Sequence, residues 1–224
     1  MGETSPWVID SVPVRCCAAD MKKRFRGFTL GLLLLVALGA GCVHALNPFY
    51  RAKDVIFDPV LVGSWSPDGT TNANKGVWKF EAGEGQAYGL TCTGEKDGLP
   101  ESLEFEVHLF RLGEERFLDV IPTGRSAEKV SEPYGWLGFF RPTHTAIHLP
   151  KAVGGLLPMQ SLKDDKFKPG NGIKNLPARE LYGDGRIVLG GSTRELQGFL
   201  RRTLKEDGWW NDTETLMPVQ LGAK

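Results

Sequence analysis

Short runs of strand-forming residues recur along this chain, separated by turn signals, and this pattern strongly limits the folds open to it. In the clearest run, LEFEVHL over 103–109, apolar and polar residues alternate at every step, as on a strand with one buried face. The runs are PVLVGSW, GVWKFEAG, AYGLTCTG, SLEFEVHLFRLG, RFLDVIPTG, WLGFFRPTHTAIHLP and GRIVLGG. Breaks such as PDGTTN and EKDGLP carry the residues that turns require. The pattern predicts a mainly β domain over 59–224, an antiparallel barrel or sandwich.

A helix is predicted only near the C-terminal end, over TRELQGFLRRTLKEDG from Thr193. Its apolar residues recur at helical spacing, so we expect one face to pack on the barrel. Ser192 and Glu195 have the spacing of a capping box, and Gly208 is typical of a helix end. A second, weaker helix is predicted over LLPMQSLKDDKF (156–167).

An export signal occupies residues 21–41. Four basic residues follow Met21, and an uncharged apolar run from Phe28 to Ala40 leads through Gly41 to Cys42. This order of basic head, short apolar body and small-residue exit is typical of a cleaved signal peptide. The apolar run is shorter than the roughly 20 residues that a membrane-spanning helix needs. Residues 1–20 do not resemble part of a signal, so we expect translation to begin at Met21 or this segment to be disordered.

The residues before Cys42 resemble the lipobox of bacterial lipoproteins, in which the cysteine becomes the acylated first residue of the mature protein. The resemblance implies a palmitate-type anchor on Cys42, followed by a short linker over 42–58. Val43 is not aspartate, which by analogy with sorting in Gram-negative bacteria favours the outer membrane of the cell envelope. The alternative is a secreted protein that is cut after Ala45.

The β-rich part resembles the calycins, the lipocalin-like barrels. Their first strand carries Gly-x-Trp, here Gly63-Ser64-Trp65, and their last strand leads into an amphipathic helix, as RIVLGGSTRELQGFL does. The resemblance implies a barrel with a helix on its wall and an arginine that covers the tryptophan, for which Arg194 and Arg186 are candidates. The segment from NPFYRAKDVIFDPVLVGSW onward also resembles bacterial lipoproteins without an assigned activity.

Charge and cysteine content exclude some classes of function. The chain has 27 basic and 27 acidic residues, and removal of residues 1–41 leaves 22 basic and 24 acidic ones. A nucleic-acid-binding protein normally has a basic excess, so that class is excluded. Cys92 is the one cysteine inside the predicted domain, where we expect a buried strand residue.

No catalytic residues, metal site or cofactor are predicted. His144 and His148 are spaced like some helical metal ligands, but the context of RPTHTAIHLP favours a strand. Four residues along a strand span about 13 Å, too far for one metal ion to bridge. No nucleophile elbow, phosphate loop or zinc-ligand cluster occurs, which leaves a hydrolase as the third choice of function.

Trp136, Phe139 and Phe140 lie in YGWLGFF, where alternation sends neighbouring aromatic residues to opposite faces of a strand. One face then packs under the helix, or it forms a ligand mouth or partner surface. For Trp209 and Trp210 the same two interpretations remain, packing in the core or forming a ligand or partner surface.

Two functions follow from these features. The first is a membrane-anchored, non-enzymatic lipocalin-like protein that binds a small apolar ligand or presents a surface. The alternative is an accessory lipoprotein that contacts another protein of the envelope. An interior with small residues and a cavity favours the first, and an interior filled with bulky side chains favours the second.

Overall fold

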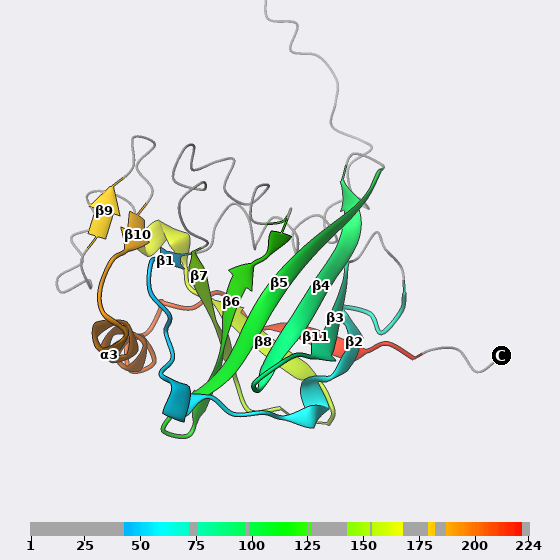
Figure 1. The fold of residues 1–224 in the computed structure, drawn as a ribbon, viewed down its shortest axis with the longest axis horizontal. Coiled ribbons are helices and arrows are strands. Elements are labelled where there is room, and N and C mark those ends of the chain that lie inside the picture. The colour runs from blue at the N-terminus through cyan, green and yellow to red at the C-terminus, as the bar shows by residue number, and fades with distance from the viewer. Residues whose placement is uncertain are drawn as a thin grey trace, which may run out of the picture.

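The computed structural model describes residues 43–71, 76–96, 99–124, 126, 143–152, 154–167, 179–181 and 187–220. Eight of the described strands close into an antiparallel barrel (Figure 1). Around the barrel these are β2 (Gly63–Ser66), β3 (Val77–Ala82), β4 (Ala87–Lys96), β5 (Leu99–Leu112), β6 (Glu115–Pro122), β7 (His144–Leu149), β8 (Leu157–Ser161) and β11 (Glu214–Pro218), which returns to β2. The prediction of a mainly β fold with an antiparallel barrel is confirmed.

Alternation along β5 has the predicted consequence. Leu103, Phe105, Val107 and Leu109 are buried in the barrel, whereas Glu104 and Glu106 between them are exposed. The period of two therefore places one face of this strand in the core and the other in solvent.

The sheet branches at β7. One edge of β7 pairs with β6, and the other edge is shared by two partners. Residues 147–148 pair with β8, whereas residues 144–145 pair with β1 (His44–Ala45). β1 is parallel to β10 (Ile187–Leu189), which pairs with β9 (Arg179–Leu181). A three-stranded branch of the same sheet, β1, β10 and β9, thus extends from the barrel wall.

The helix α3 (Thr193–Thr203) begins as predicted. The Ser192 backbone N–H donates to Oε2 of Glu195 at 2.8 Å, and the Glu195 N–H donates to Oγ of Ser192 at 3.4 Å, which completes the capping box. Figure 1 shows α3 beside the barrel rather than across its end. Within the described ranges, no helix has both the length and the apolar character needed to cross a bilayer.

Two apolar cores lie on either side of the wall formed by β6 and β7. The first fills the barrel. The second lies outside this wall, where Phe110 and Phe117 pack with Leu196, Phe199 and Leu200 of α3. All six residues of β7 are buried, because both of its faces are covered.

Two expectations are corrected by the fold. The second helix predicted over 156–167 is wrong, because this stretch forms β8 and a short 3-10 helix, η5 (Asp164–Phe167). Residues 43–58, expected as a linker, are part of the fold: they contain β1 and η1 (Ala52–Asp54), and Phe49 is fully buried. The next turn is a 3-10 helix, η2 (Pro59–Leu61).

Candidate functional site

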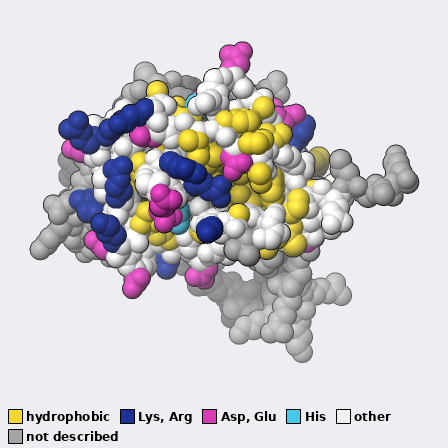
Figure 2. Space-filling model, turned by 90° about the horizontal axis from the view of Figure 1, so that it is seen from below, with side chains coloured by type: hydrophobic (Ala, Val, Ile, Leu, Met, Phe, Trp, Pro, Cys, Tyr) yellow, Lys and Arg dark blue, Asp and Glu magenta, His cyan; other side chains and the backbone are white. Residues whose placement is uncertain are grey.

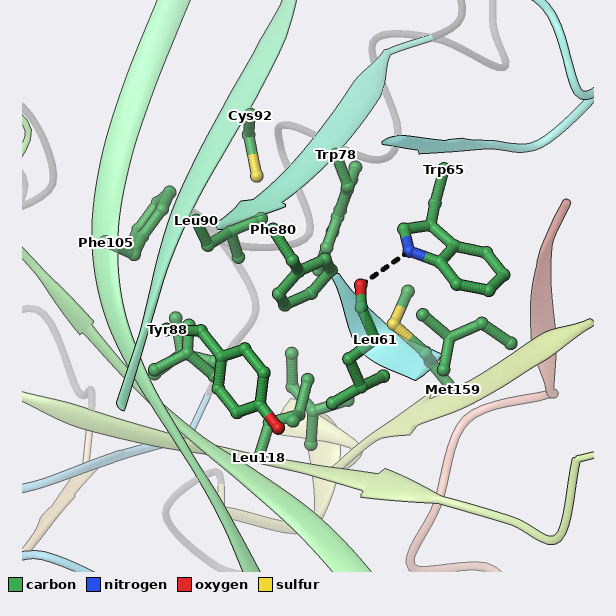
Figure 3. Packing of buried hydrophobic residues seen from close by; sticks show 14 of the residues in the cluster. Leu61, Trp65, Trp78, Phe80, Tyr88, Leu90, Cys92, Phe105, Leu118 and Met159 are labelled. Atoms are coloured by element: carbon green, nitrogen blue, oxygen red, sulfur yellow. Dashed lines mark hydrogen bonds between the residues drawn. The ribbon is translucent and has the colours of Figure 1, made fainter. Parts of the chain in front are cut away.

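The barrel interior is filled by bulky side chains (Figure 3). Its buried residues include Trp65, Trp78, Phe80, Tyr88 and Phe105, each at most 6% exposed. Leu, Val, Ile and Met side chains from the other strands of the barrel pack against them. These side chains line the volume in which a lipocalin-type ligand would lie.

The Gly-x-Trp motif has a local structural role at the start of β2. Gly63 has a φ of +142°, a conformation that residues with a side chain rarely adopt. The Trp65 indole is buried in the barrel, and its Nε1–H donates to the carbonyl oxygen of Leu61 at 2.9 Å (Figure 3). Arg194 is exposed on the first turn of α3, and Figure 1 shows α3 on the opposite side of the barrel from β2. The main-chain carbonyl of Leu61 therefore supplies the hydrogen-bond acceptor for the indole N–H of Trp65.

Residues 55–62 close one end of the barrel, drawn in cyan at the bottom of Figure 1. We call it the lower end; the β3–β4, β5–β6 and β7–β8 connections also lie there. The Ile56 N–H donates to the carbonyl of Leu109 at 2.9 Å. The hydroxyl of Tyr88 accepts from the Asp58 N–H at 2.6 Å and donates to the Asp58 carbonyl at 3.1 Å. The Arg116 guanidinium lies 3.1 Å from the Asp58 carboxylate. The segment is thus fixed by side chains of the barrel rather than by its own sequence alone.

The outer surface of this closing segment is apolar. Phe57 is 41% exposed, Val60 66% and Val62 41%, and Leu156 on the β7–β8 connection is 37% exposed. We call these four residues the apolar lower face. Figure 2, which views the molecule from below, shows hydrophobic side chains gathered over one part of this end, bordered by charged side chains of both signs. Such a concentration is typical of a contact surface.

Sequence reasoning missed this surface. The sequence analysis expects a strand over PVLVGSW and a linker over 42–58, and neither expectation predicts an exposed apolar surface here. Asp58 and Pro59 instead begin η2, where the Asp58 carboxylate caps the Val60 N–H at 3.0 Å. The Asp-Pro pair within an apolar run was the available signal for a turn with apolar residues on both sides.

A second group of polar residues is buried under the layer that contains β1. The Asp119 carboxylate is fully buried; it accepts from Nδ1 of His144 at 2.8 Å and from the Phe49 N–H at 2.8 Å. His148 lies on the same strand, with Nε2 2.8 Å from Glu115 and Nδ1 3.0 Å from Gln160. Both histidines lie on a strand, as predicted. The Asp119 contacts tie the N-terminal segment to the barrel wall.

The described part of the chain contains no group of three or more His, Cys, Asp or Glu side chains arranged to hold a metal ion. Cys92 is buried in the barrel, and this burial raises the pKa of its thiol far above the usual value. A thiol in this state is a poor nucleophile. Cys92 therefore acts as an apolar core residue.

The remaining predicted residues are placed as follows. Cys42, Trp136, Phe139 and Phe140 lie outside the described residues. Trp209 and Trp210 are half-buried against the second core: the Trp209 ring lies 5.5 Å from that of Phe199, and the Trp210 ring 6.1 Å from that of Phe117. This tryptophan pair thus packs mainly as core.

No family model matches the chain, and comparison with curated proteins and with solved structures gives no match either.

Proposed function

We propose that this chain is a lipid-anchored, non-enzymatic protein of the bacterial cell envelope whose lipocalin-like barrel acts through its outer surface, by contact with another envelope protein. The observation that carries this proposal is the filled barrel interior, closed at its lower end by residues 55–62. A barrel of this kind serves as a rigid support for its surface. The apolar lower face offers such a surface, with an apolar centre and a charged border, as in protein interfaces.

The position of β1 supports cleavage before Cys42 over cleavage after Ala45. Val43, His44 and Ala45 are all buried, and β1 lies between β7 and β10 in the sheet. A protein that begins at Leu46 would lose this strand, whereas one that begins at Cys42 keeps it. The fold then starts at the residue that follows the anchor, which keeps the domain close to the bilayer.

Metabolic palmitate labelling and the intact mass of the mature protein test the anchor. We expect labelled wild type and unlabelled Cys42→Ala, with a first residue of Cys42 in the wild type. An unlabelled product that begins at Leu46 would overturn the anchor.

Titration with a fluorescent fatty acid tests the filled barrel. We expect no saturable binding to the purified protein. Stoichiometric binding that quenches tryptophan fluorescence would instead support the function of binding a small apolar ligand.

A further inference from the structure

The described chain begins inside the fold, one residue after Cys42. Val43 is 4% exposed, and β1, which follows it, lies between β7 and β10. The Leu46 N–H then donates to the carbonyl of Leu189 at 2.9 Å. Consecutive Cα atoms are about 3.8 Å apart, so a lipid on Cys42 would be attached directly to the sheet, with no linker that lets the domain turn. The surface around Val43 therefore decides which side of the domain faces the bilayer.

The strand pairing fixes the position of Val43. β8 and β1 pair with the same edge of β7, one after the other. β8 pairs as far as Ile147 and β1 pairs from Thr145, so only the position of Ala146, in a span of about 7 Å, separates the two strands. The chain leaves β8 at Leu162 beside the point where Val43 leads into β1, and both side chains belong to the core that contains Ala146. Leu162 and the residues that contact it therefore lie next to the proposed anchor.

Two tryptophans contact this part of the chain. Trp210 forms an isolated β-bridge with Leu162, and the carbonyl of Trp209 accepts from the Lys163 N–H at 2.9 Å. Both tryptophan side chains are half-buried: they pack on the second core, and the remainder of each is accessible. The accessible parts of the pair thus lie on the side of the domain where Val43 enters the sheet.

Tryptophan is enriched where a protein meets the headgroup region of a membrane, because its ring is apolar and its N–H forms a hydrogen bond. The Trp209 Nε1–H donates to the exposed Glu206 carboxylate at 2.9 Å. Glu206 belongs to the turn after α3, together with Lys205 and Asp207, all exposed. This turn has no basic excess, so charge alone would not bring the surface to an anionic bilayer. The anchor, rather than charge, would hold it there.

We propose that Trp209 and Trp210 lie in the headgroup region of the membrane that carries the anchor. The inference rests on the lipid anchor of the proposed function. It places the side of the domain that contains β1 against the bilayer. Figure 1 shows β1 in the upper part of the molecule and residues 55–62 at the bottom, so the apolar lower face stays accessible to an envelope protein.

Tryptophan quenching by brominated lipids tests this orientation. The mature wild type, isolated with its lipid, is inserted into phosphatidylcholine vesicles with or without bromine on the acyl chains near the headgroups. We expect bromine to quench part of the emission. The double variant Trp209→Phe, Trp210→Phe should lose this quenching, since Trp65 and Trp78 are buried in the barrel. Unquenched emission from vesicle-bound wild type overturns the orientation, as does quenching that is unchanged in the double variant.

A fluorophore on an introduced cysteine provides a measurement that keeps both tryptophans. Lys163→Cys and its control Leu99→Cys receive the same thiol-reactive dye, and Cys92 is buried away from it. Leu99 is 70% exposed at the tip of the β4–β5 hairpin. A nitroxide on the lipid headgroup should quench the dye at residue 163 several-fold more than the dye at residue 99. Equal quenching at the two positions would place the bilayer contact elsewhere.

Palmitate labelling of the same preparations separates this inference from the anchor itself. Labelled, vesicle-bound protein whose tryptophan pair is not quenched overturns the orientation and leaves the anchor in place. Unlabelled protein that stays in solution overturns both.

Discussion

The hydroxyl of Tyr88 and the main chain of Asp58 are joined by two hydrogen bonds, one to the amide at 2.6 Å and one to the carbonyl at 3.1 Å. The two residues are thirty positions apart, so a single side chain of β4 fixes the segment that closes the lower end. This pair, together with the η2 turn that Asp58 caps, sets the position of Phe57 and Val60.

Tyr88→Phe should lower the free energy of unfolding by about 1–2 kcal/mol, because both hydrogen bonds are lost and the Asp58 amide stays half-buried without this acceptor. Urea denaturation followed by tryptophan fluorescence measures the change. Tyr50→Phe is the control, because the contacts of Tyr50 with His108 and Phe110 involve its ring. Equal losses in both variants would contradict a specific role for the Tyr88 hydroxyl.

The same residue predicts a dependence of stability on alkaline pH. Burial raises the pKa of Tyr88 above its ordinary value of 10.0. Since the folded pKa is the higher one, the stabilisation by Tyr88 is fully present below pH 10.0 and is lost as the pH rises through the folded pKa. The difference in unfolding free energy between wild type and Tyr88→Phe should therefore stay constant up to about pH 10 and narrow between about pH 10 and about pH 12. A constant difference across this range would show that the hydroxyl is not buried as described.

Asp119→Ala should cost about 3–5 kcal/mol, since it leaves His144 and the Phe49 N–H without their buried acceptor. We also expect trypsin to cut faster after Arg51 and Lys53, because the N-terminal segment loses its tie to β6. Glu81→Ala removes a carboxylate from an exposed pair and should cost less than about 0.5 kcal/mol. An Asp119→Ala protein as stable as Glu81→Ala would show that the buried carboxylate is dispensable.

Gly63→Ala should destabilise the fold by about 1–3 kcal/mol, because an alanine at a φ of +142° is strained even though no atom lies within 4 Å of its Cβ. Gly89→Ala is the matched control: its Cβ also meets nothing within 4 Å, and its φ is ordinary. Thermal unfolding of the two variants separates backbone strain from crowding. A neutral Gly63→Ala would mean that the motif glycine serves another purpose.

Local patterns were sufficient to predict β3 to β7, β10 and the helix cap, but not β1, β8, β9 or β11. The alternation of LEFEVHL places Phe105 and Val107 inside, and the spacing of Ser192 and Glu195 predicts the cap that forms. Both signals depend on residues a few positions apart, so they can be read without knowing the fold. The fully buried β7 is different, since its burial depends on distant segments that cover its second face.

The apolar lower face could not be predicted from the sequence, because it too depends on contacts between residues that are distant in the chain. Phe57 and Val60 have the composition of core residues, and their exposure follows from contacts with Tyr88 and Arg116, which are distant in the chain. The weak helix over 156–167 fails because Leu157 and Met159 pair with β11, and β7 supplies the other neighbour. Arg194 has a suitable residue type for the calycin arginine, but its place on α3 is set by the tertiary structure.

The wall formed by β6 and β7 belongs to both cores at once. Leu118 and Val120 face the barrel, while Phe117 faces the layer under α3. If α3 and the N-terminal segment detached, the outer side of the barrel wall would be exposed to water. Neither core can therefore unfold alone without a large loss of buried apolar surface. We therefore expect a single cooperative transition, in which amide protons of β7 and α3 exchange at the same global rate.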